Sequence, residues 1–145
     1  MITNRWIGYT VVFDDSPFNG NNPFNLKADL KSLGINEAQK LELKIKLEEE
    51  LKKGGPRKDA FRHICGSIIS VFAADVRCAD EHGGKSSGYR VFLMVVPPLK
   101  KGFVLGVVRH KHKSKDTTLT DQAKKQLKKI VDVVENLTKG DQKGE

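Results

Sequence analysis

The sequence predicts an α+β fold in which a small, mostly antiparallel sheet is covered by two N-terminal helices and one C-terminal helix. Two observations support this prediction: capped helical segments lie together in the first half of the chain, and apolar, β-branched segments dominate the second half. The expected order is strand, helix, helix, strand, strand, strand, helix. Because 145 residues suffice for one hydrophobic core, we expect a single domain over residues 1–138, followed by a disordered polar tail over 139–145.

The first half of the chain is expected to form one strand and two helices. Residues 6–13, WIGYTVVF, are rich in aromatic and β-branched side chains, which favour strands. The next segment, 14–25, contains proline, glycine and asparagine, a composition typical of a loop. A short helix is expected over 26–33 and is ended by Gly34. A longer helix follows over 36–53, where Gly-Gly-Pro closes it.

The second half is expected to form three strands and a helix. The apolar run 64–76 is ambiguous between a strand and a buried helix, and we expect a strand from about residue 69 to 78. Two strong strands, 89–96 and 102–110, are close enough to form an antiparallel hairpin. The last helix is predicted after Thr118, a candidate cap. Its apolar stripe consists of Leu119, Ala123, Leu127, Ile130, Val131, Val134 and Leu137.

Positive charge is concentrated near the C-terminus. Lysine and arginine total 26 against 18 acidic residues, which gives a net charge of +8. Between residues 109 and 129 there are eight lysines or arginines and two histidines, but only two aspartates. The segment 109–115, RHKHKSK, contains no acid, and four lysines lie off the apolar stripe of the final helix. This pattern predicts an interface for a phosphate backbone, and an ordinary solvated surface is the alternative.

The sequence gives a simple expectation for localisation. No apolar run approaches the roughly 18 residues that a membrane span needs, and the N-terminus lacks the apolar stretch of a signal peptide. The two cysteines, Cys65 and Cys78, suggest neither a disulfide framework nor a four-ligand zinc site. We therefore expect a cytoplasmic protein that does not bind membranes.

Three features between residues 83 and 130 indicate a family. The sequence SGYRV opens a strand, the following apolar strand ends in the basic cluster, and a helix begins with the pattern Leu-Thr-x-x-x-Lys-Lys. Together they resemble the C-terminal half of RelE/HigB-like toxins of type II toxin–antitoxin systems, members of the RelE/ParE superfamily. The order of strands and helices expected here agrees with the RelE-like fold. Many such toxins cleave mRNA in the ribosomal A site, whereas relatives inhibit DNA gyrase without cleaving anything.

The resemblance implies that Arg90, in SGYR, is a catalytic residue that contacts phosphate. Cleaving RNA without a metal requires a base for the 2′-hydroxyl proton, cations around the pentavalent phosphate, and an acid for the leaving 5′-oxygen. A guanidinium fork suits a phosphate. The alternative is that Arg90 pairs with a carboxylate on the face of the sheet.

The basic cluster supplies further candidates, because the family places catalytic cations where Arg109, His110, Lys111, His112 and Lys113 lie. Strand alternation would put the two histidines on one side and the other three side chains on the opposite side. Histidine titrates near neutral pH and can act as base or acid. Both histidines are therefore catalytic candidates, and the alternative is that they are exposed and idle. The other three are predicted to bind nucleic acid.

Two basic residues upstream complete the predicted RNA-binding set. Arg77 aligns approximately with a basic residue of the family, and Lys85 lies in a loop from which it could reach a phosphate. One feature departs from the family: several relatives carry a catalytic tyrosine after the basic cluster, and residues 113–121 contain none. His110 and His112 could hold a metal, but no carboxylate or cysteine lies at a suitable spacing. We therefore predict no metal and no cofactor.

The resulting hypothesis is a toxin of a toxin–antitoxin pair that acts as a metal-independent, ribosome-dependent mRNA endoribonuclease and inhibits translation. Its expected partners are a cognate antitoxin and mRNA on the ribosome. The antitoxin is expected to contact either residues 109–115 or the helix 36–53. Two alternatives remain: a non-enzymatic toxin of the same fold that inhibits gyrase or another protein, and a non-toxic nucleic-acid-binding module. The missing tyrosine favours the former, whereas the His-Lys-His run argues against it.

Overall fold

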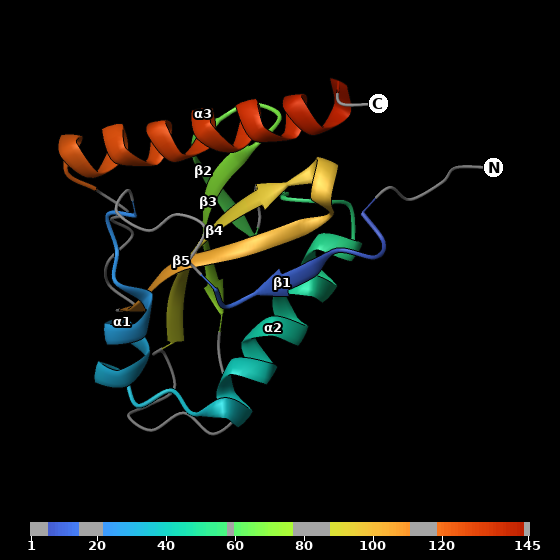
Figure 1. Cartoon of the computed structure of the whole chain (residues 1–145). Coiled ribbons are helices and arrows are strands. Elements are labelled where there is room, and N and C mark those ends of the chain that lie inside the picture. Colours follow the sequence, from blue (N-terminus) through green and yellow to red (C-terminus); the bar gives the residue numbers. More distant parts are fainter. Residues whose placement is uncertain (1–5, 15–21, 58–59, 77–87, 111–118, 144–145) are drawn as a thin grey trace.

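The computed structural model describes residues 6–14, 22–57, 60–76, 88–110 and 119–143 (Figure 1). Its helices and strands are, in order, β1 (Thr10–Val12), α1 (Leu26–Ser32), α2 (Glu37–Lys52), β2 (Phe61–Gly66), β3 (Ser70–Val76), β4 (Gly88–Val96), the 3₁₀ helix η2 (Pro97–Leu99), β5 (Lys101–His110) and α3 (Asp121–Lys143). The prediction of an α+β fold is confirmed. No helix in these described ranges is long and apolar enough to cross a membrane.

One five-stranded sheet forms the centre of the molecule, with the strand order β1-β5-β4-β3-β2. β1 pairs with β5 in parallel, and the other three neighbouring pairs are antiparallel. The expectation of a mostly antiparallel sheet is therefore confirmed. The expected hairpin is formed by β4 and β5, which η2 connects.

The structure contains one strand more than the predicted order. The additional strand is β2, whose sequence lacks the alternation of buried and exposed residues that predicts a strand. Only Phe61 and Cys65 are buried in it, and a register shift between His63 and Cys65 interrupts the two-residue period. The first strand is also shorter than predicted. Residues 6–8 form a turn in which Gly8 has a φ of 92°, so β1 begins only at Thr10.

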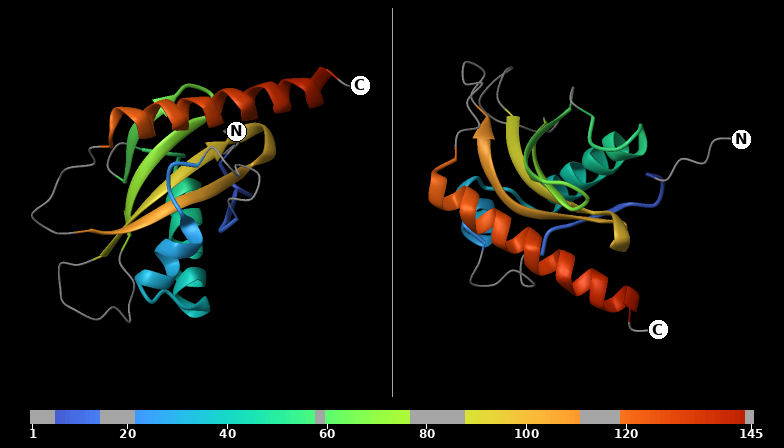
Figure 2. Two further views of the ribbon diagram at one scale, coloured as in Figure 1. Left: turned by 60° about the vertical axis from the view of Figure 1, so that its left-hand side comes forward. Right: turned by 90° about the horizontal axis from the view of Figure 1, so that it is seen from above.

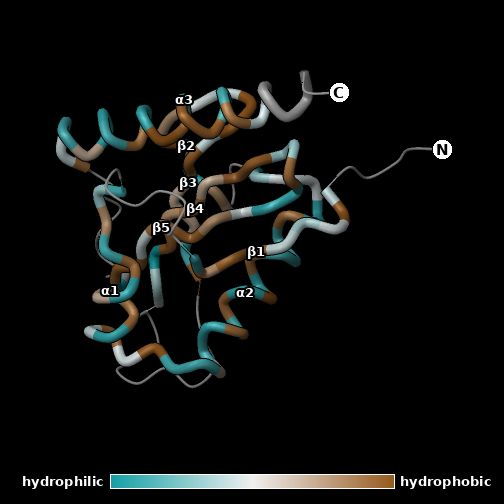
Figure 3. Tube along the Cα trace, in the orientation of Figure 1, coloured by the Kyte–Doolittle hydropathy of each residue, from teal (hydrophilic) through white to brown (hydrophobic). Residues whose placement is uncertain are grey.

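The sheet separates two apolar cores. On one face, Leu43, Leu47 and Leu51 of α2 contact side chains of the strands, and Leu26 of α1 joins them. On the other face, α3 crosses the sheet and contributes its own apolar stripe to the second core (Figures 1 and 2). Most apolar positions of α3 lie on the side facing the sheet (Figure 3), but Leu137, the last member of the predicted stripe, is 64% exposed. The fold is thus a three-layer arrangement of helices, sheet and helix.

Side-chain caps set where the helices begin. The side chains of Asn25 and Asn36 accept hydrogen bonds from backbone N–H groups in the first turns of α1 and α2. Thr120 does the same for α3, since its Oγ1 accepts from the Ala123 N–H at 3.0 Å. The helix therefore begins after Thr120 rather than after Thr118. It continues to Lys143, so its backbone is helical over part of the tail that we expected to be disordered.

The segment before α1 covers the edge of β5 that β1 is too short to reach. β1 pairs with residues 101–103 of β5 and no further. Beyond that point, Asn22 Nδ2 donates to the Leu105 carbonyl at 3.0 Å, and the Val107 N–H donates to Asp29 Oδ2 at 3.1 Å. Side chains thus replace a strand partner, and they hold α1 against the sheet.

Candidate nucleic-acid interface

The outer side of α3 presents a cluster of lysines. Leu127, Ile130 and Val131 of α3 are buried against the sheet. The 3.6-residue period of the helix then directs the intervening positions to solvent. We call the exposed set the α3 lysine surface, and it consists of Lys124, Lys125, Lys128 and Lys129.

The α3 lysine surface differs from the lysines of α2 in how its charge is compensated. On α2, Lys40, Lys44 and Lys46 each form an ion pair with a glutamate three or four residues away. Lys53, the C-cap residue that follows α2, pairs with Glu50 at 3.3 Å. No ion pair joins the α3 lysine surface to any acidic side chain in the described ranges. Its positive charge is thus directed at solvent, whereas that of α2 is largely neutralised.

Two charged residues of α3 affect the pKa of one buried cysteine, Cys65. Cys65 lies in the core between β2 and α3 and is 5% exposed. Burial raises the pKa of its thiol; the nearby Lys128 lowers it and Asp132 raises it. Cys65 is therefore a protonated core residue near neutral pH rather than a nucleophile.

Arg109 lies at the end of β5, on the face of the sheet opposite to α3. Its guanidinium carbon is 5.1 Å from the centroid of the Tyr89 ring. Tyr89 is its cross-strand partner and belongs to the core beneath α2. The cation–π contact orients an exposed cation over a buried ring. Arg109 is therefore accessible, as the predicted nucleic-acid-binding role requires.

Arg90 is buried instead, with 5% of the residue exposed. Its Nε donates to Asp75 Oδ1 at 2.9 Å, across the β3–β4 pair in which the two residues are direct partners. Phe92 and Met94 of the same strand belong to the core beneath α3, so alternation places Arg90 on that face. This is the alternative considered from the sequence, an arginine paired with a carboxylate on the sheet. The sequence alone does not reveal Asp75 as the partner, since the pairing depends on the register between the two strands.

The predicted site residues do not converge in the described part of the chain. Arg90 and Arg109 project from opposite faces of the sheet. His110 pairs through its backbone with Gly88, at the end of the sheet where Arg90 and Arg109 lie. The remaining candidates lie outside the described residues; they are Arg77, Lys85, Lys111, His112 and Lys113.

The described residues offer a binding surface rather than a metal centre. Within the described ranges, no three histidine, cysteine, aspartate or glutamate side chains gather as a metal site requires. Arg109 and the α3 lysine surface present accessible cations, which suit a polyanion. Comparison of the chain with protein-family models, with curated proteins and with solved structures found no match.

Proposed function

We propose that this protein binds RNA through the α3 lysine surface and acts as the toxin of a toxin–antitoxin pair, cleaving mRNA on the ribosome. The observation that supports it best is the contrast between the two long helices. Lysines paired with glutamates, as on α2, have little attraction left for a polyanion. Unpaired lysines on one helix face can instead neutralise phosphates and so release the counterions that are bound to the RNA.

The burial of Arg90 changes which residues would perform the cleavage. A guanidinium held by Asp75 within the sheet would have to leave that partner and become exposed before it could touch a scissile phosphate. We therefore assign contact with the scissile phosphate to Arg109, and contact with other phosphates of the RNA backbone to the α3 lysine surface. Proton transfer is assigned to His110 and His112, because imidazole can serve as base or acid near neutral pH.

Induced expression of four forms of the protein tests this function. These forms are the wild type, the double variant His110→Ala/His112→Ala, an α3 variant and an α2 control. The α3 variant carries Lys124→Gln, Lys125→Gln, Lys128→Gln and Lys129→Gln. The α2 control carries Lys40→Gln, Lys44→Gln, Lys46→Gln and Lys53→Gln, so it loses the same number of positive charges.

We expect growth arrest and codon-phased mRNA breaks, mapped by primer extension, from the wild type and the α2 control. The double variant should lose the breaks, because it lacks the groups that move protons, and the α3 variant should lose them because it no longer holds RNA. Absence of arrest from the folded wild type would contradict the toxin function. Equal activity of the α3 and α2 variants would contradict the assignment of the RNA surface.

A second candidate is a toxin that inhibits gyrase or another protein without cleaving RNA. The internal pairing of Arg90 with Asp75 favours it, because the arginine that the resemblance assigns to catalysis is not displayed. Arrest without mRNA breaks, retained by the His110→Ala/His112→Ala variant, would establish this candidate over the first.

The proposed toxin requires an antitoxin, and charge indicates where it binds. An acidic segment complements the α3 lysine surface and Arg109, and it would cover the surface assigned to RNA. We therefore expect antitoxin and RNA to compete. The helix α2 is the weaker candidate for this contact, because Lys40, Lys44 and Lys46 are already paired with glutamates of the same helix.

A further inference from the structure

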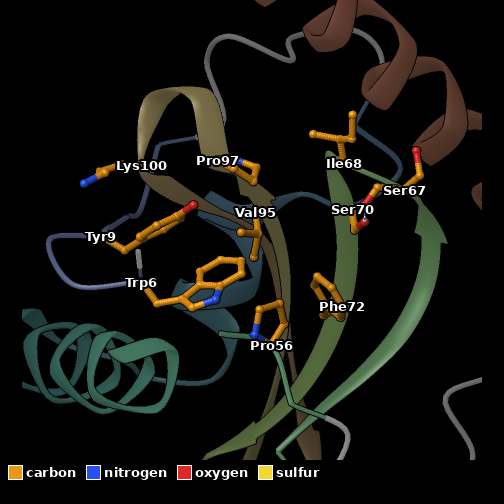
Figure 4. A pocket seen from close by; sticks show the side chains of 10 residues that line it. All are labelled: Trp6, Tyr9, Pro56, Ser67, Ile68, Ser70, Phe72, Val95, Pro97 and Lys100. Atoms are coloured by element: carbon orange, nitrogen blue, oxygen red, sulfur yellow. Dashed lines mark hydrogen bonds between the residues drawn. The ribbon is translucent and has the colours of Figure 1, made fainter. Parts of the chain in front are cut away.

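A cavity of about 440 Å³ opens at the end of the sheet where β3 begins and β4 ends (Figure 4). Its position is settled by the register, because Ser70 pairs with Val95 at this end, whereas Val76 pairs with Tyr89 at the other. The cavity is therefore far along the sheet from Arg109. It lies on the face covered by α2, since Phe72 and Val95 belong to that core.

Aromatic rings form much of the cavity wall. Figure 4 shows Trp6 and Tyr9 on one side and Phe72 with Ser70 on the other, with Val95 between them. Tyr9 and Phe72 are each 8% exposed, and Val95 is 2% exposed, so the walls are held by the core. The volume lies within the range of small-molecule sites, roughly 300–1,000 Å³.

Trp6 is held in the wall by a close approach to the chain. Its ring centroid is 5.0 Å from that of Tyr9, with the planes at 39°. On the other side it meets Gly55, where an added Cβ would lie 2.3 Å from the indole. Gly55 also has a φ of 84°, a conformation that other residues rarely adopt. A glycine is therefore needed here for the indole to occupy its place in the wall.

Polar groups are few: the Tyr9 hydroxyl and the Trp6 indole N–H belong to the wall, and the others lie at the margins of the cavity. Ser70 and Ser67 line one side, and the Ser70 hydroxyl donates to the Ser67 carbonyl at 2.6 Å. Lys100 is the one charged residue among the described residues that line the cavity, and its ammonium end points outward in Figure 4. Its backbone is fixed in the left-handed region, with φ 51°. No acidic side chain of the described ranges lines the cavity.

We propose that this cavity binds a nucleotide, with the base between Trp6 and Phe72 and the phosphate outside, near Lys100. A nucleobase is a flat ring that gains from contact with aromatic side chains, and its edge can bond to serine hydroxyls. A phosphate next to the base would be attracted by Lys100 at the rim, and no acidic side chain of the described lining would repel it. The same chemistry is offered by a free mononucleotide and by an unpaired base of RNA.

The proposal goes beyond RNA binding at α3 and does not depend on it. Trp6 is the single tryptophan of the chain, so its fluorescence reports on the cavity directly. Titration with AMP should quench this fluorescence saturably, whereas ribose 5-phosphate, which lacks the base, should not. Adenosine should quench at concentrations about tenfold higher, because it lacks the phosphate that Lys100 attracts.

Two matched variants locate the binding. Ile68 lines the cavity and is 71% exposed, so Ile68→Asp adds a negative charge at its mouth without disturbing the core. It should weaken AMP binding about tenfold. Leu137→Asp makes the same kind of change at a residue of α3 that is 64% exposed, and it should leave AMP binding unchanged. The α3 variant should also retain AMP quenching, even if it loses RNA.

The source of the nucleotide is decided by comparing AMP with a ten-nucleotide oligoadenylate. Quenching by the oligomer at a lower nucleotide concentration than AMP would assign the cavity to an unpaired base of RNA, and the reverse would assign it to a free nucleotide. The proposal is overturned if neither ligand quenches Trp6 saturably. It is equally overturned if ribose 5-phosphate quenches as AMP does, or if Ile68→Asp and Leu137→Asp bind AMP alike.

Discussion

Arg90 and Asp75 form a partly buried ion pair, and we expect this pair to stabilise the fold. Removing the carboxylate leaves a guanidinium that is 5% exposed without the acceptor 2.9 Å from its Nε. Asp75→Ala should therefore lower the free energy of unfolding by about 1–3 kcal/mol, measured by urea denaturation. Glu49→Ala, at an exposed position of α2, should change it by less than about 0.5 kcal/mol. Equal effects of the two substitutions would show that the pair does not stabilise the sheet.

Asp29 links α1 to β5, and its contribution to the free energy of unfolding depends on pH. Burial raises the pKa of its carboxyl above the usual 3.8, and the hydrogen bond from the Val107 N–H offsets part of that rise. The folded state then holds the proton more tightly than the unfolded state. Consequently, the contribution of Asp29 to stability falls as the pH rises from below 3.8 through the folded pKa.

Asp29→Asn should remove this pH dependence, because the amide oxygen still accepts from Val107 while carrying no charge. In urea denaturation between pH 3 and pH 7, the variant should gain stability relative to the wild type as the pH rises. The gain should be less than about 1 kcal/mol, since the side chain is half-buried and partly screened by water. A difference that stays constant over this range would contradict the assignment.

At the scale of elements, the segment before α1 substitutes for the missing length of β1. The Phe24 ring stacks on Phe92, with centroids 4.5 Å apart. A Cβ at Gly106 would lie 2.6 Å from Phe24 Cβ and Cγ. This glycine is therefore required for the segment to approach β5 closely.

A double-mutant cycle tests this contact. Gly106→Ala should lower the free energy of unfolding by about 1–3 kcal/mol, because Phe24 must move from its place on the sheet. In a Phe24→Ala background the obstacle is absent, and the same substitution should cost less than about 0.5 kcal/mol. If Gly106→Ala lowered the free energy of unfolding equally in both backgrounds, Gly106 and Phe24 would not interact as described.

Elements with one clear local signal could be predicted from the sequence. The apolar runs that became β4 and β5 have strong strand composition, and asparagine caps mark the starts of α1 and α2. β2 has no such signal, because its bulge interrupts the alternation of buried and exposed residues. It forms because it pairs with β3, which is not visible in its own sequence. The partner of Arg90 was hidden for a related reason, because cross-strand pairs depend on the register.

At the scale of the whole molecule, the sheet holds two chemically different regions at its two ends. Arg109 lies at one end, and the α3 lysine surface faces solvent along the helix that crosses the sheet. The aromatic cavity lies at the other end. The concentration of charge near the C-terminus was visible in the sequence, whereas the cavity was not. Its walls come from four separate segments of the chain that only the fold brings together.

The salt dependence of RNA binding reports directly on the α3 lysine surface. For single-stranded RNA, the slope of log K against log salt concentration changes by about 0.7 for each phosphate contact. The α3 variant should therefore lose about 2–3 units of the wild-type slope and bind weakly at every salt concentration. The α2 control should keep the wild-type slope to within about 0.5. Identical slopes for the wild type and the α3 variant would show that RNA is bound elsewhere or not at all, and would contradict RNA binding by the α3 lysine surface.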